Sequence, residues 1–231
     1  MTTQEFSDAF DVLLNSHAET VGHGIPGGMP TVSLDEYEKS VLLTEAQQDV
    51  VQGLYNGALN GRAFEETEEL RSALQGLIRT ATPEAATDVT GVSGDSSFFT
   101  LPSDVWFITY ESVALSSGSY CNDTAIEVVP MRQDEWHRAK RNPFRQPSER
   151  RAVRLDCGQG IVEIIAAYPI ASYTVRYLRK PRPIILVDLT DPLLSIDGRT
   201  EVTECELGVM LHRPILMQAV RLALLRYTNK K

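Results

Sequence analysis

The chain has 231 residues, of which 42% are hydrophobic and 23% are charged, values typical of a soluble globular protein and too apolar for a wholly disordered one. No apolar run reaches the roughly 18 residues of a membrane span, and residues 1–6 lack the basic and apolar regions of a secretory signal, so we expect a protein of the cytosol. The net charge of −9 is uneven, because residues 1–131 hold 4 Lys and Arg against 20 Asp and Glu, whereas residues 132–182 hold 12 against 5.

The first third of the chain predicts helices. Apolar residues recur at helical spacing over residues 5–14, with a polar face behind them, and this predicts one helix. Residues 22–30 contain four glycines and two prolines, which predicts a loop. Another helix is predicted from residue 64 or 65 to residue 78, where an acidic first turn suits the helix dipole.

Two N-terminal capping signals lie between these helices. Ser33 stands three residues before Glu36, the spacing of a capping box, and this predicts the start of a short helix. Thr44 repeats the arrangement before an apolar row, which predicts a second helix over residues 45–55.

From about residue 90 the pattern changes to that of β-strands. Strands are predicted over residues 96–101 and 105–115, and a turn at 116–119 predicts an antiparallel return over 120–129. Pro130 ends that strand, and a short helix over residues 133–141 is predicted to end before Asn142-Pro143. Further strands are predicted over residues 152–156, 161–168, 172–178 and 183–189.

The last 25 residues predict a long helix. Pro214 leaves two possibilities open: the helix begins at this proline, or a longer helix from Leu207 is kinked by it. We expect the helix to pack on the sheet. The predicted fold class is α+β, with an N-terminal helical region over residues 1–89 and a mostly antiparallel β-rich region with the C-terminal helix over residues 90–231, together one compact unit.

The sequence has no recognisable motif for catalysis or metal binding. The glycine-rich residues 22–30 hold no lysine that could bind phosphate, and the four histidines lack zinc-site spacing. Asp188, Asp191 and Asp197 fit turns better than an acid–base or metal site, because Asp-Pro and Asp-Gly steps are common in turns. The three cysteines are widely spaced and are expected to be buried free thiols. We therefore predict no enzyme, no metal and no cofactor.

A basic segment over residues 132–154 is the best candidate site. Its arginines alternate with aromatic side chains, as on a nucleic-acid surface, but acidic residues interrupt it. Because arginine also pairs with carboxylates at protein interfaces, we favour a protein interface over nucleic-acid binding. The candidate interface residues, two of which lie beyond this segment, are Arg132, Trp136, Arg138, Lys140, Arg141, Phe144, Arg145, Arg150, Arg151, Arg179 and Lys180.

Several strings of residues, taken in order, resemble one known family. A Pro-Met-Arg-Gln-Asp-Glu-Trp string at residues 130–136 is followed by Asn-Pro-Phe within residues 142–147. A strand pair with adjacent basic residues and prolines spans 175–186, and a Cys-Glu-Leu string opens the closing helix over 205–223. Residues 32–55 fit the opening of the same pattern. These strings resemble the head-to-tail connector, or ring, proteins of crAss-like tailed bacteriophages.

The resemblance covers most of the chain and implies a structural protein of the virion. It implies a ring, dodecameric in number, at the head-tail junction below the portal protein, with phage DNA passing through its channel. The implied partners are further copies of the chain, the portal protein, other connector or tail proteins and that DNA, with no membrane, and the protein would be made in the host cytoplasm. Pro214 departs from the family pattern, which has a helix-compatible residue there.

Two other classes of function remain open. A nucleic-acid-binding adaptor would use the basic segment 132–154 and would bind in a salt-dependent way. A small enzyme with a site assembled across strands would need a deeply buried ionisable group with a shifted pKa. The resemblance favours the ring hypothesis. The charge distribution supports it, because an acidic first third and a basic middle provide the complementary faces that heterologous ring contacts need.

Overall fold

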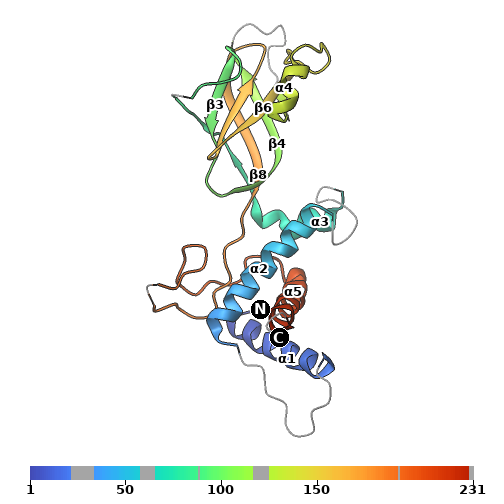
Figure 1. Ribbon diagram of the computed structural model, residues 1–231, viewed down its shortest axis with the longest axis vertical. Coiled ribbons are helices and arrows are strands. Elements are labelled where there is room, and N and C mark those ends of the chain that lie inside the picture. Colours follow the sequence, from blue (N-terminus) through green and yellow to red (C-terminus); the bar gives the residue numbers. More distant parts are fainter. Residues whose placement is uncertain (22–33, 58–65, 88, 117–124, 192, 229–231) are drawn as a thin grey trace. The chain divides into compact units, whose positions relative to one another are not determined.

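The computed structural model describes residues 1–21, 34–57, 66–87, 89–116, 125–191 and 193–228. The chain divides into two compact units. Met1–Leu77 and Pro181–Lys231 form the helical unit, and Ile78–Lys180 form the sheet unit (Figure 1). Helices and one sheet together confirm the predicted α+β class. None of the helices described is long and apolar enough to cross a bilayer.

Three long helices build the helical unit: α1 (Thr3–Val21), α2 (Glu36–Tyr55) and α5 (Val209–Thr228). Helix α5 packs against both α1 and α2 (Figure 1), whereas the sequence placed it on the sheet. The core between them is apolar, with Phe10, Leu43 and Ile215 fully buried. The α5 helix begins before Pro214, which lies inside it, so the proline is not its first residue.

Helix α2 is one continuous helix, where the sequence predicted two. Its N-cap is Asp35, whose Oδ1 accepts a hydrogen bond from the Glu38 backbone N–H at 2.7 Å, while the Glu38 carboxylate accepts one from Asp35 N–H at 3.4 Å. Ser33, the predicted cap, lies outside the described residues. Thr44 is not an N-cap, because it lies buried in the middle of α2. Its hydroxyl forms hydrogen bonds with the backbone of Ile184.

The next helix, α3 (Glu68–Leu74), is shorter than predicted. Its N-cap is Thr67, and a 3₁₀ turn over Gln75–Leu77 follows it. Ile78, predicted as the last helical residue, instead begins strand β1, because it pairs with Leu178. The predicted starting residues 64 and 65 fall outside the described part of the chain, as does the predicted loop over residues 22–30.

Within its described residues, the sheet unit holds one sheet of eight strands in the order β1-β8-β4-β5-β6-β7-β3-β2. The strands are β1 (Ile78–Ala81), β2 (Glu84–Ala85), β3 (Ser96–Thr100), β4 (Val105–Leu115), β5 (Ile126–Pro130), β6 (Arg151–Gly158), β7 (Ile161–Ile165) and β8 (Ile170–Arg179). Neighbouring strands are antiparallel except β5 and β6. The rings of Phe99 and Tyr173, from strands far apart in this order, lie 5.1 Å apart, so the sheet curls around its core.

A short helix, α4 (Gln133–Ala139), covers the outer face of β6 and β7 (Figure 1). Strands alternate side chains between their two faces. Ala152 therefore points into the core of the curled sheet, while Val153 and Leu155 pack beneath Trp136 of α4. The helix predicted over residues 133–141 is confirmed as α4. Five predicted strands are also confirmed, with bounds shifted at some ends: those over residues 96–101, 105–115, 152–156, 161–168 and 172–178.

The remaining strand predictions are confirmed only in part or are wrong. The antiparallel return is confirmed for β5, which pairs with β4, but residues 117–124 are not described. Strands β1 and β2 were missed. Residues 183–189 form no strand, since Ile185 makes only an isolated bridge with Thr203 and the extended chain lies along α2.

The cysteines are free thiols where the structure describes them. Cys205 is half-buried, but Cys157 is exposed near the end of β6, so the prediction of burial is wrong for Cys157. Cys121 lies outside the described residues.

Candidate assembly surface

The last residues of α4, the chain that follows and the first residue of β6 form a loop held by hydrogen bonds, which we call the arginine loop (residues 138–151). Asn142 organises it: the side-chain Oδ1 accepts a hydrogen bond from Phe144 N–H at 2.9 Å, and the backbone carbonyl accepts one from Arg145 N–H at 2.9 Å. The Arg151 guanidinium donates to the Phe144 carbonyl at 2.7 Å. These bonds hold the backbone while the Phe144 side chain stands 87% exposed.

Most cations of the arginine loop have no acidic partner within the described chain. Arg145 is the weak exception, with its Nη2 4.0 Å from a Glu135 carboxylate oxygen. The exposed cations without an ion pair among the described residues are Arg138, Lys140, Arg141 and Arg150. The loop thus combines an apolar tip with uncompensated positive charge, a combination suited to binding an acidic surface.

Two other candidate residues, Trp136 and Arg132, contact residues outside the arginine loop. Trp136 is 5% exposed and packs on Val153 and Leu155, so its ring belongs to the core of the sheet unit. Arg132 is exposed at the start of α4 and forms an ion pair with Asp134 at 2.8 Å. The alternation of arginines and aromatic residues in the sequence therefore does not translate into one surface, because only Phe144 is exposed.

Arg179 and Lys180 lie away from the arginine loop. Arg179 pairs with Val105, the first residue of β4, whereas β5 pairs with β4 near Ser112. Since Arg151 pairs with Glu127 of β5, the loop adjoins this second region. About seven residues of strand at about 3.3 Å each separate the two regions.

A buried ionic cluster in the sheet unit was missed by sequence reasoning. Arg154 donates from Nη1 to Glu111 Oε2 at 2.6 Å, and the Tyr173 hydroxyl donates to the same carboxylate. Burial, reinforced by the charge of Glu111, raises the pKa of Tyr173. Arg154 therefore neutralises a buried acid that joins strands β4, β6 and β8, and is not part of a basic surface.

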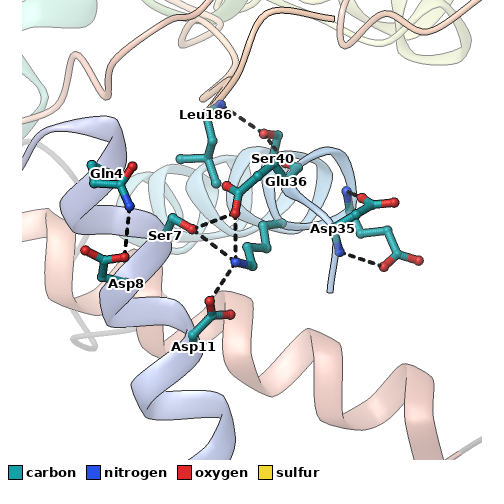
Figure 2. A network of polar contacts seen from close by, with 10 residues as sticks. Gln4, Ser7, Asp8, Asp11, Asp35, Glu36, Ser40 and Leu186 are labelled. Carbon is teal, nitrogen blue, oxygen red and sulfur yellow. Dashed lines mark hydrogen bonds and ion pairs between the residues drawn. The ribbon is translucent and has the colours of Figure 1, made fainter. Parts of the chain in front are cut away.

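A second ionic cluster ties α1 to α2 in the helical unit, and Figure 2 shows its labelled members Ser7, Asp11 and Glu36. Lys39 is 3% exposed, and its Nζ lies 2.7 Å from Asp11 Oδ2, 2.9 Å from Glu36 Oε1 and 3.0 Å from Ser7 Oγ. Burial would lower the pKa of Lys39, but the two carboxylates outweigh it and raise the pKa. A protonated lysine cannot take a proton from Ser7, so this pair stabilises the fold and is not a nucleophile with its base.

The chain between the extended segment along α2 and helix α5 forms a second arm with exposed residues, which we call the acidic hairpin (residues 185–191 and 193–204). Ile185 and Thr203 exchange backbone hydrogen bonds of 3.0 Å, and Ile196 and Arg199 close its inner turn. Asp197 and Gly198 occupy that turn with φ of 49° and 75°, the left-handed conformation that favours Asp-Gly.

Two further aspartates of the acidic hairpin accept hydrogen bonds from backbone N–H groups. The Asp188 carboxylate accepts from Val202 N–H at 2.7 Å, and the Asp191 carboxylate accepts from Leu193 N–H at 2.9 Å. These observations confirm the predicted turn roles of Asp191 and Asp197. Asp188 instead joins two segments of the hairpin, because Val202 lies fourteen residues further along the chain. Leu193 is 89% exposed on this arm.

Comparison with known proteins identifies the family. A family model described as phage tail ring protein 3/4 matches residues 1–231. The chain is 46% identical over 236 residues to Ring protein 3 of Bacteroides phage crAss001, covering 99% of this chain and 97% of the relative. It is 31% identical over 243 residues to Ring protein 4/5 of the same phage, covering 98% and 94%. The chain therefore belongs to the phage tail ring protein 3/4 family of crAss-like phages and is a structural component of the virion.

Proposed function

We propose that this chain forms a closed ring of identical copies in the head-to-tail connector, below the portal protein, and that the ring lines or supports the channel for the genome. The full-length match to a ring protein family supports this role. We propose twelve copies, the portal protein and other connector or tail proteins as neighbours, and the head-tail junction as its place in the virion. Its role is mechanical, and no turnover of a substrate is expected.

The arginine loop is the observation that carries the proposed assembly mode. A cyclic ring needs heterologous contacts, in which one surface of a subunit meets a different surface of the next. Uncompensated cations around exposed Phe144 make one such surface. Arg141, Arg145 and Arg150 bind acidic groups of a neighbour, while Arg151 positions the loop through the Phe144 carbonyl.

The overall charge suits a wall past which DNA moves. A wall that neutralised many phosphates would hold the DNA, since each neutralised phosphate adds binding free energy through counterion release. The net charge of −9 argues against such retention over the molecule as a whole. We propose accordingly that the cations of the arginine loop are covered by protein contacts in the ring.

A nucleic-acid-binding adaptor is the second candidate, because the arginine loop also offers an exposed aromatic ring beside free cations. It predicts binding of DNA that weakens steeply as salt rises and that Arg141→Glu with Arg150→Glu abolishes. Fluorescence anisotropy with a labelled DNA duplex at low salt tests this. A flat binding curve removes the adaptor function.

The ring function is tested by counting this chain against the portal subunit in purified virus particles by quantitative mass spectrometry. A fixed copy number close to that of the portal is expected. Absence from the particle, or a number that varies between preparations, would contradict the connector ring. Native mass spectrometry of the purified chain then gives the number of copies in the ring.

A further inference from the structure

We propose that the arginine loop of one copy docks onto the acidic hairpin of the next copy around the ring. This inference rests on the proposed ring and deepens it, because it names the second surface of the heterologous contact. The occupant of each surface is thus another copy of this same chain. Preorganisation, apolar tips and charge each support the pairing.

The acidic hairpin is held in place before any partner binds. Gln48 of α2 donates from Nε2 to Asp197 Oδ2 at 3.2 Å, and Ile196 is 7% exposed, so the inner turn is fastened to the helical unit. The arginine loop is equally fixed by Asn142 and Arg151. Two preorganised surfaces lose little conformational freedom on docking, which favours their association.

Each surface carries a solvent-exposed apolar tip. Leu193 at 89% and Phe144 at 87% are the two most exposed large apolar side chains among the described residues. A single exposed apolar residue is ordinary, but here one stands on each of two oppositely charged arms. Aromatic residues anchor interfaces whose charged rims supply specificity.

The charges on the two arms are complementary and available. The hairpin's Asp191, Glu201 and Glu204 are exposed and make no ion pair within the described chain. Arg138, Lys140, Arg141 and Arg150 of the arginine loop are likewise unpaired. Arg199 is the basic residue of the hairpin, and it lies at the inner turn beside Ile196. Opposite charges steer the two arms together and fix which surfaces meet.

A two-for-two charge exchange tests the pairing. We compare Arg141→Glu with Arg150→Glu, called the loop variant, and Glu201→Lys with Glu204→Lys, called the hairpin variant. Each variant alone sets like charges against each other in every contact. Sedimentation velocity over a concentration series should therefore show that each needs at least about tenfold more protein to assemble than wild type.

An equimolar mixture of the two variants gives the decisive result. The loop variant carries acidic residues at all four of positions 141, 150, 201 and 204, and the hairpin variant carries basic residues at all four. Alternating copies are therefore complementary at these positions around a ring of even number. Assembly should return to near the wild-type concentration. Pairing within one chain could not produce this rescue, since in each variant the four substituted or facing positions 141, 150, 201 and 204 carry charges of one sign.

A matched control reverses the same number of acidic charges elsewhere. Glu66→Lys with Glu69→Lys changes two exposed residues in or beside α3, and assembly should match wild type. If this control prevents assembly and the hairpin variant does not, α3 is the partner and the inference is overturned. Circular dichroism checks that every variant is folded.

The experiment distinguishes failure of the proposed ring interface from failure of the proposed pairing between the arginine loop and the acidic hairpin. If the loop variant fails to assemble while the hairpin variant assembles normally, the hairpin pairing is overturned and the ring with an arginine-loop interface stands. If the loop variant assembles as wild type does, the interface in the proposed function is overturned as well. Failure of the mixture to rescue assembly overturns the pairing between the two arms.

Discussion

His212 is a buried histidine in the centre of the helical unit. It is 4% exposed, its Nε2 donates to the Leu207 carbonyl at 3.0 Å, and its ring centroid lies 5.1 Å from that of Phe6. Burial lowers the pKa of His212 below its usual value of 6.5. The neutral ring is therefore the form that the folded protein contains near pH 7.

This predicts that the helical unit loses stability in mild acid. As pH falls below about 6.5, the unfolded chain takes up a proton at His212 that the folded chain does not, so the free energy of unfolding decreases. Urea unfolding at pH 7.5 and 5.5 should show a larger decrease for wild type than for His212→Gln, which keeps a donor for Leu207. His137→Gln, at an exposed position, should retain the wild-type decrease. Equal decreases in wild type and His212→Gln would contradict the prediction.

Trp136 and Phe144 give opposite predictions although both are aromatic residues of the same basic segment. Trp136→Ala leaves a cavity under α4 and should lower the free energy of unfolding of the sheet unit by about 3–5 kcal/mol. Phe144→Ala should change it by less than about 0.5 kcal/mol, because the side chain is exposed, yet it should weaken assembly. Thermal unfolding and sedimentation of both variants check this, and similar losses of stability in the two would refute the assignment.

At the scale of elements, α2 supplies polar side chains in place of a missing neighbouring strand. Ser40 Oγ accepts from Leu186 N–H at 3.0 Å, Thr44 Oγ1 accepts from Ile184 N–H at 3.1 Å, and Gln47 donates to the Arg182 carbonyl at 3.2 Å. Their spacing places all three on one face of the helix. The extended segment 183–186 can therefore be buried without a β-ladder.

Thr44 is the central contact of this arrangement. Thr44→Val keeps the volume but leaves the buried N–H of Ile184 without its partner, which should cost about 1–3 kcal/mol of unfolding free energy. Thr190→Val, at an exposed threonine of the same unit, should stay within about 0.5 kcal/mol of wild type. Chemical denaturation measures both, and a Thr44→Val protein as stable as wild type would show that these bonds contribute nothing.

Local patterns predicted the elements whose burial follows the chain's own periodicity. Strands β4 and β8 were found because their β-branched and aromatic residues are dense, and α5 because it is long and apolar. Residues 183–189 have the same apolar texture as a strand, but their partner is a helix distant in sequence. The capping box Asp35-Glu38 was readable from the sequence, and the earlier Ser33-Glu36 spacing obscured it.

Features that depend on distant partners could not be predicted. Strand β1 is only four residues long and exists because it pairs with β8, about a hundred residues later. Lys39 stands in a helix where a lysine normally faces solvent, and its burial depends on Asp11 and Ser7 from α1. Trp136 lies in the core because α4 needs an apolar residue to pack on β6. The candidate residues that are exposed together on one loop are Arg138, Lys140, Arg141, Phe144, Arg145 and Arg150, and their role as an interface stays a prediction.

At the scale of the whole molecule, the sheet unit is inserted between two parts of the helical unit. The chain enters it at Ile78 and leaves after Lys180, and these two ends are neighbours because β1 pairs with β8 from Ile78 and Leu178 onward. The unit has its own apolar core, centred on buried residues such as Val113, Ile164 and Tyr173. Close ends and a separate core are the properties of a domain that can fold alone.

We therefore predict that a fragment of residues 78–180 folds when expressed by itself. Its circular dichroism should be that of a β-protein, and it should unfold cooperatively because its core and its Glu111–Arg154 ion pair lie wholly inside the fragment. A fragment of residues 84–180 is the control. It lacks β1, exposes the edge of β8 and should be less stable or aggregate. If residues 78–180 remained unfolded while the full chain folded, the sheet unit would depend on the helical unit, and the ring subunit would be a single cooperative structure.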